Sequence, residues 1–114
     1  MTIVESTSDK AAGVVILTLT GRIDTATSDY VGQTLTSCID RGVRRLVLDL
    51  GAVDYISSVG LRSLILAAKR LTPLGGRLGL CRLQPRIVQL FDIAGFTPLF
   101  PIAATVDEAA ELLS

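Results

Sequence analysis

Two consecutive serines, Ser57 and Ser58, have the placement best suited to chemistry in this sequence. They come shortly after an apolar strand and directly before an amphipathic segment, where the carboxyl end of a strand passes into a helix. Ligand and partner sites gather at this edge of open α/β sheets, and a helix N-terminus stabilises an exposed anion by about 0.3–1 kcal/mol. A phosphoryl group on one serine would add about −1.5 to −2 charges, which suits an on/off switch. Serine pairs before helices are common, however, and from the residues alone an ordinary N-cap is the favoured interpretation.

Charged residues near the serines have both a functional and a structural interpretation. Arg62 lies four residues after Ser58, on the same helical face, where it could pair with a phosphate. A solvated surface arginine is the simpler interpretation. Asp49 and Asp54 could suggest a paired acid/base site, but nothing near them in the sequence supplies a nucleophile with an activating base. These residues therefore give a small α/β enzyme little support.

The composition excludes several classes of function. The 114 residues contain no histidine, which removes Ser–His–Asp triads, Cys–His pairs and histidine zinc sites. Lys plus Arg and Asp plus Glu balance at 11 each, so no electrostatic footprint indicates direct binding of nucleic acid or of an anionic membrane surface. Cys38 and Cys81 form no CxxC unit and are predicted to be reduced core thiols, with one disulfide as the alternative. No cofactor and no metal site are predicted.

Apolar runs in the chain are short. The longest has five residues, Leu64 to Ala68, and cannot cross a bilayer. The first residues include Glu5 and Asp9 and lack the apolar core of a secretory signal. We therefore expect a soluble, cytoplasmic protein without membrane insertion.

Periodicity and turn residues predict the elements that position the serines. We expect strands at 14–20, 44–50, 77–81 and 99–102, and a weak extended lead at 2–5 that could pair with the first strand as a hairpin. We expect helices from Thr25, capped by Asp24 or Thr25, to near Gly42, at 58–71, at 85–94, and from the capping box Thr105–Glu108 to Leu113. The first helix is predicted to place these residues on its apolar face: Ala26, Tyr30, Val31, Leu35, Cys38 and Ile39. The third is predicted to turn these inward: Ile87, Leu90, Phe91 and Ala94.

The order of these elements predicts the fold class. A strand-rich start is followed by helix and strand in regular alternation, and a crossover helix between strands implies parallel neighbours. No internal repeat, low-complexity tract or linker interrupts the pattern. We therefore expect a layered α/β fold in a single domain, residues 1–114.

Several separate motifs resemble one known family. They are the run from Leu46 to Leu71, the later segments Gly75-Gly76-Arg77-Leu78 and Leu90-Phe91-Asp92-Ile93-Ala94-Gly95-Phe96, and Gly21-Arg22-Ile23-Asp24 after the first strong strand. Together they resemble the STAS domain, and most closely the free-standing bacterial anti-sigma factor antagonists. The resemblance spans essentially the whole chain. It implies a mixed, mostly parallel sheet of about four to five strands with about four helices, two or more of them packed on one face.

The resemblance also implies a phosphorylation site. The family segment Asp-Ser-Ser/Thr-Gly-Leu corresponds here to Ser57-Ser58-Val59-Gly60-Leu61, so the phosphorylatable serine falls on Ser58, with Ser57 as the alternative. Ser57 replaces the common Asp, and Val59 replaces the common second hydroxyl. The resemblance further suggests that Asp24 lies near Ser58 and orients its hydroxyl, although a helix N-cap is as consistent with Asp24. The implied phosphosite neighbourhood and partner surface comprises Asp24, Tyr55, Ser57, Val59, Gly60, Leu61 and Arg62. For Val59 and Leu61, core packing is at least as consistent as partner contact.

The function implied by the resemblance is partner switching without catalysis by this chain. The unphosphorylated form would bind an anti-sigma factor, itself a serine kinase of the histidine-kinase-like ATPase fold, and so free a sigma factor. Phosphorylation of Ser58 would release the antagonist, and a PP2C-type phosphatase would reset it. The alternative is a non-phosphorylated STAS adaptor in a lipid-transport ABC complex or another signalling assembly.

Overall fold

Five strands form one mixed sheet in the computed structural model of the protein, which describes residues 1–95 and 100–113. β1 (Thr2–Thr7) pairs antiparallel with β2 (Val14–Ile23), which confirms the predicted hairpin. The remaining strands are parallel neighbours in sequence order: β3 (Arg45–Ile56), β4 (Arg77–Cys81) and β5 (Ile102–Ala103). The sheet is therefore mixed and mostly parallel, as predicted.

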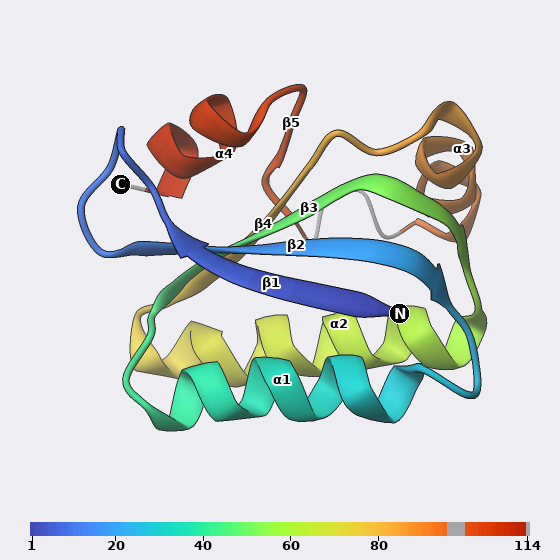
Figure 1. Cartoon of the computed structure of the whole chain (residues 1–114), viewed down its shortest axis with the longest axis horizontal. Helices are drawn as coiled ribbons and strands as arrows, with labels where there is room; N and C mark the ends of the chain where they lie inside the picture. Colours follow the sequence, from blue (N-terminus) through green and yellow to red (C-terminus); the bar gives the residue numbers. More distant parts are fainter. Residues whose placement is uncertain (96–99, 114) are drawn as a thin grey trace.

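The described residues include four α-helices, which cover both faces and one end of this sheet (Figure 1). α1 (Ser28–Asp40) and α2 (Ser58–Leu71) lie side by side on one face, while α4 (Val106–Leu113) lies on the other (Figure 1). α3 (Pro85–Ala94) lies near the end of β3, at the carboxyl edge of the sheet (Figure 1). A 3-10 turn, η1 (Thr72–Leu74), closes α2. The arrangement confirms the predicted layered α/β fold.

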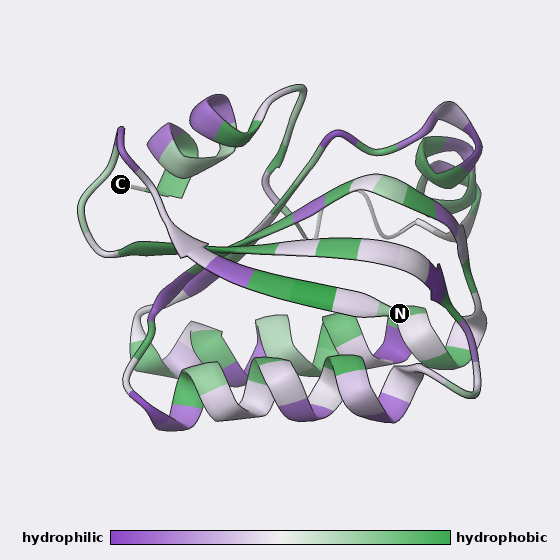
Figure 2. Cartoon of the chain, in the orientation of Figure 1, coloured by the Kyte–Doolittle hydropathy of each residue, from purple (hydrophilic) through white to green (hydrophobic). Residues whose placement is uncertain are grey.

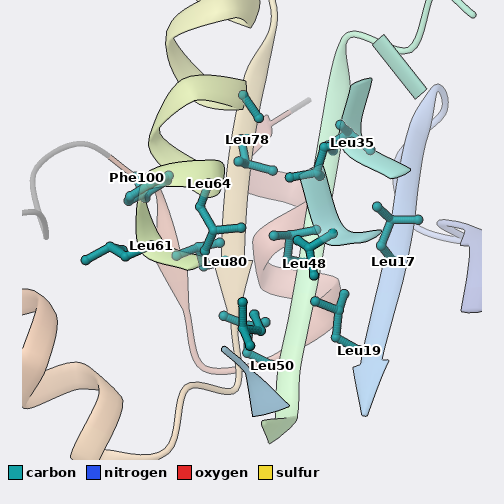
Figure 3. Packing of buried hydrophobic residues seen from close by; sticks show 14 of the residues in the cluster. Leu17, Leu19, Leu35, Leu48, Leu50, Leu61, Leu64, Leu78, Leu80 and Phe100 are labelled. Atoms are coloured by element: carbon teal, nitrogen blue, oxygen red, sulfur yellow. The ribbon is translucent and has the colours of Figure 1, made fainter. Parts of the chain in front are cut away.

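An apolar cluster fills each side of the sheet. The larger one joins the sheet to α1 and α2 and includes Leu17, Leu19, Leu35, Leu48, Leu61 and Leu64 (Figure 3). The smaller one lies under α4 and includes Val14, Ile16, Val47, Cys81, Ala109, Ala110 and Leu113. Because both faces of β3 are covered, its centre is apolar on both sides. Cys38 and Cys81 are both buried and form no disulfide, in agreement with the predicted core thiols.

The two central strands are longer than predicted. β2 continues through Gly21 to Ile23, and β3 continues past Leu50 to Ile56, through the segment expected to be a connection. The register explains the difference, because β3 holds an extra residue at two places. Between Thr18 and Thr20 of β2, β3 advances three residues, and between Gly21 and Arg22 it advances two. Such bulges bend a strand and re-aim the residues at its end, which here are the serine pair.

The helices differ from prediction mainly at their ends and edges. α1 begins at Ser28 rather than Thr25, with Thr27 at the N-cap, so Ala26 and Tyr30 are exposed rather than inward. The other four predicted inward residues of α1 are buried: Val31, Leu35, Cys38 and Ile39.

At the C-terminal end, part of the prediction is confirmed. In α3, Ile87 and Phe91 are buried, whereas Leu90 is 38% exposed and was wrongly predicted to point inward. The last strand is β5 at 102–103 rather than 99–102, and Leu99 lies outside the described residues. The predicted cap of α4 forms: the Glu108 amide donates to the Thr105 hydroxyl at 3.1 Å.

Candidate functional site at the junction of β3 and α2

Ser57 joins the end of β3 to the start of α2. Its amide donates to the Ile23 carbonyl of β2 at 2.7 Å, and its carbonyl accepts from the Leu61 amide at 2.8 Å. Its hydroxyl accepts from the Gly60 amide at 3.1 Å, so Ser57 is the N-cap of α2. The side chain is half-buried. The capping role that the sequence allowed for either serine therefore belongs to Ser57.

Ser58 is the first helical residue of α2, and its side chain is exposed. Its hydroxyl has no hydrogen-bond partner among residues 1–95 and 100–113. The two serines thus differ in availability: Ser57 is engaged by its own helix, while Ser58 presents a free hydroxyl at the helix N-terminus. A dianion at this position would lie near the positive end of the helix dipole.

Gly60 allows the first turn of α2 to sit directly on the end of β2. A Cβ atom built on Gly60 would lie 2.4 Å from Cγ2 of Ile23 and 3.1 Å from its carbonyl oxygen. That carbonyl is the acceptor for the Ser57 amide. Any larger residue at position 60 must therefore push the helix away from the contact that places Ser57 and Ser58.

Asp24 follows Ile23 and shapes the turn between β2 and α1. Its Oδ1 accepts from the amides of Ala26 and Thr27 at 3.0 and 3.1 Å and from the Thr27 hydroxyl at 3.2 Å. In the described chain it makes no hydrogen bond to Ser58. Thr27 is the residue directly before α1 but makes no side-chain cap bond, and the capping contacts of the turn that leads into the helix come from Asp24, as one of the two predicted cap candidates. That Asp24 orients the Ser58 hydroxyl stays a prediction.

The other predicted site residues divide between surface and core. Tyr55 is 43% exposed, and the guanidinium of Arg22 lies 4.7 Å from its ring centroid. Val59 is 48% exposed, whereas Leu61 is buried in the core. Arg62 is exposed and makes no ion pair within the part of the chain that the structure describes. A partner could therefore touch Tyr55, Val59 and Arg62 but not Leu61.

One polar cluster was missed by sequence reasoning. Asp49, buried on β3, accepts from Arg82 Nη1 at 3.0 and 3.3 Å and from the Gly51 amide at 3.0 Å. Arg82 adopts a left-handed backbone conformation (φ 57°), which costs a non-glycine residue about 1–2 kcal/mol. Burial, and then the Asp49 carboxylate, raise the pKa of Cys81 to about 12. Asp49 and Arg82 lie 33 residues apart, so no local pattern could have paired them.

Acid/base and metal chemistry find little support in the site. Asp49 is buried and paired with Arg82, while Asp54 is exposed, so the two do not act as a carboxylate pair. Within the described residues, no group of three or more His, Cys, Asp or Glu could hold a metal ion. None of the helices in the same ranges has the length and apolar character needed to span a membrane.

Comparisons with known proteins agree with this architecture. The family model of the STAS domain matches residues 6–109. A Bordetella bronchiseptica protein that carries the provisional name anti-sigma factor antagonist BtrV is 43% identical over 104 residues, covering 91% of this chain and 90% of its own length. The crystal structure of an anti-sigma factor antagonist from Mycobacterium paratuberculosis superposes with a TM-score of 0.86 at 27% identity, covering 98% of this chain and 92% of that one.

Two structures of the anti-sigma factor antagonist SpoIIAA share the fold at 18% identity. The unphosphorylated form has a TM-score of 0.79 and covers 97% of this chain and 95% of its own. The phosphorylated form, from Bacillus, has a TM-score of 0.73 and covers 97% and 98%. The fold is thus shared with anti-sigma factor antagonists, one of which has a known structure in both the unphosphorylated and the phosphorylated form.

Proposed function

Because this chain belongs to the STAS domain family, we propose that it is an anti-sigma factor antagonist switched by phosphorylation of Ser58. The unphosphorylated form binds an anti-sigma factor and frees a sigma factor, and the phosphorylated form lets the anti-sigma factor go. The chain is the substrate and binding module in this scheme and performs no catalysis itself. The site of action is the cytoplasm, where sigma factors meet RNA polymerase.

The observation that carries the proposal is the difference between the two serines. The Ser57 hydroxyl accepts a hydrogen bond from the Gly60 amide, whereas Ser58, the next residue, is exposed and has a free hydroxyl. This supports Ser58 as the acceptor and Ser57 as the residue that holds the helix in place. The names of the relatives support the antagonist role.

The transfer step would balance as an ordinary phosphoryl transfer. The Ser58 oxygen attacks the γ-phosphorus of ATP held by the anti-sigma factor, a kinase of the histidine-kinase-like ATPase fold. The bond to the bridging oxygen breaks, ADP leaves, and a base on the kinase takes the hydroxyl proton. A PP2C-type phosphatase would reverse the modification by hydrolysis. The product carries about −1.5 to −2 charges where the chain had a neutral hydroxyl.

That added charge gives the switch its physical basis. Tyr55 and Val59 are exposed on either side of the serines and offer the partner an apolar contact. A phosphate buried in that contact would lose its hydration, which makes binding of the partner less favourable. Arg62, on the next helical turn and without an ion pair in the described chain, is placed to compensate the phosphate once the partner has left.

The proposal is tested by adding ATP and each anti-sigma factor of the source organism to the purified chain and locating phosphate by peptide mass spectrometry. We expect phosphate on Ser58, none on the Ser58→Ala variant, and phosphate still on Ser58 in Ser57→Ala. Ser58→Ala should bind the anti-sigma factor at least as tightly as the wild type, and Ser58→Asp should bind poorly. Equal affinity of the wild type, Ser58→Asp and the phosphorylated protein would refute the switch.

A further inference from the structure

Exposed apolar side chains are concentrated at the end of the molecule that carries Ser58. Ten large hydrophobic residues are exposed among the described residues, and half of them lie on the end of β3, the first turn of α2 and α3: Tyr55, Val59, Val88, Leu90 and Ile93. All three segments lie at the same end of the molecule, where β3 ends (Figure 1). Ile93 is 87% exposed, more than any other of the ten.

α3 carries exposed apolar residues in addition to its buried ones. Ile87 and Phe91 are buried against the core, and Phe91 packs on Phe100 with ring centroids 5.9 Å apart. Leu90 and Ile93, three residues apart and therefore adjacent on the helix surface, remain exposed. Figure 2 shows hydrophobic stretches on this helix with hydrophilic ones between them. The helix also exposes Arg86, Gln89 and Asp92, so its outer side is only partly apolar. Leu90 and Ile93 form an exposed apolar pair of the kind found at protein interaction sites.

The start of α3 is tied to the strand that ends at the serines. Gln84, the N-cap residue of α3, donates its side-chain amide to the Gly51 carbonyl of β3 at 3.3 Å. Two residues earlier, Arg82 pairs with Asp49 of β3, whose side chain is only 7% exposed. Both contacts hold the loop before α3 against β3. The outer face of α3 and the serine pair are therefore presented from one common strand.

We propose that Leu90 and Ile93 of α3, together with Val59 and Tyr55, form one docking surface for the anti-sigma factor, here called the edge patch. The proposal rests on the proposed function and adds α3 to the surface that the partner covers. The two parts of the edge patch are attached to one strand, because the loop before α3 is bound to β3 and the switch serine follows the end of β3.

The charges around the edge patch favour a partner that must be released on phosphorylation. The charged residues of α3, the end of β3, the start of α2 and the adjoining end of β2 balance at three of each sign: Arg22, Arg62 and Arg86 against Asp24, Asp54 and Asp92. The unmodified surface thus has neither the positive field that nucleic acid or an anionic membrane requires nor an excess of negative charge. Contact must come from the apolar side chains, and a phosphate on Ser58 would place roughly two negative charges in that contact.

The test measures the affinity of the unphosphorylated chain for the purified anti-sigma factor, by titration calorimetry. Ile93→Asp should weaken binding by about tenfold or more, as expected for an apolar anchor of an interface. Its melting temperature should match that of the wild type, since the side chain is 87% exposed in the free protein. The matched control is Leu66→Asp, because Leu66 is an exposed apolar residue of α2 (55%) outside the edge patch. This control should bind within about twofold of the wild type.

Each result distinguishes this inference from the proposed function. Wild-type affinity in Ile93→Asp overturns the inference, while weak binding of Ser58→Asp in the same assay would still support the switch. Equal weakening by Leu66→Asp and Ile93→Asp also overturns it, because the effect would not be specific to the edge patch. If Ile93→Asp is poorly folded, Ile93→Ala and Leu90→Ala replace it, with a smaller loss of affinity expected from each. A wild-type dimer in light scattering that Ile93→Asp converts to monomer would assign the patch to a second copy instead. Failure of every anti-sigma factor to bind the wild type refutes both proposals.

Discussion

Replacing Gly60 by alanine should weaken the junction that presents the serines, although alanine is the better helix former. The new Cβ would lie 2.4 Å from Cγ2 of Ile23 and 3.1 Å from its carbonyl oxygen, and that oxygen belongs to backbone that cannot rotate away. Overpacking of this kind costs about 1–3 kcal/mol, against a gain of about 0.8–1 kcal/mol in helix propensity. We therefore expect Gly60→Ala to lower the free energy of unfolding by as much as about 2 kcal/mol.

Gly32 of α1 supplies the matched control. A Cβ on Gly32 would meet only Ser63, with its nearest atom at 3.7 Å, which is ordinary van der Waals contact. Gly32→Ala should therefore raise the free energy of unfolding by about 0.4–1 kcal/mol. Urea unfolding of both variants measures the difference. Ile23→Leu removes the Cγ2 methyl group from Cβ and should partly restore the stability of Gly60→Ala. The reasoning fails if Gly60→Ala proves as stable as Gly32→Ala.

Three further predictions concern the same neighbourhood. Ser57→Ala should cost about 1 kcal/mol in urea unfolding because it removes the cap of α2, whereas Ser58→Ala, which removes no hydrogen bond within the described chain, should change stability by less than about 0.5 kcal/mol. Asp49→Asn should destabilise the fold by about 1–3 kcal/mol, since it breaks the pair with Arg82 at a buried carboxylate, and an unchanged urea midpoint would contradict this. The free energy of unfolding should fall as pH rises from about 9 towards 12, because the unfolded chain loses the Cys81 proton near 9.0 and the folded chain only near 12. Urea unfolding at pH 8 and pH 10 should therefore show a smaller loss of stability for Cys81→Ala than for the wild type.

The sequence predicted the elements whose apolar residues recur at regular intervals, and it failed where β-bulges change those intervals. β4 and α2 have the predicted bounds, because Pro73 and the Gly75-Gly76 pair mark the end of the helix and a short apolar strand comes next. In β3 the inward residues first recur every second position and then every third: Leu46, Leu48, Leu50, Val53 and Ile56. A spacing of three does not resemble a strand, and the predicted strand ends at Leu50. Only the pairing with β2 makes this segment extended.

The sequence predicted where the candidate site lies, but not the role of each serine in it. The pair of serines before an amphipathic helix predicted the place, and the family resemblance predicts which serine is the phosphoacceptor. Which serine caps the helix depends on where Gly60 rests against Ile23, a contact between segments that are distant in the chain. The exposure of Leu90 and Ile93 likewise depends on how α3 lies at the sheet edge, because both residues look like core residues in the sequence.

The anchoring of Ser57 to Ile23 has a consequence for the enzyme that would modify Ser58. The Ser57 amide is fixed to β2 at 2.7 Å and its hydroxyl to Gly60, so Ser58 is held in helical geometry and is not part of an extended loop. A kinase whose groove accepts only stretched peptides would first have to unwind the start of α2 and break both contacts. A synthetic peptide covering residues 51–65 has the same local sequence but lacks β2, and isolated helices of this length are marginal in water. The determinant of recognition would therefore be the folded surface, and denatured protein or peptide should be a poor phosphoacceptor.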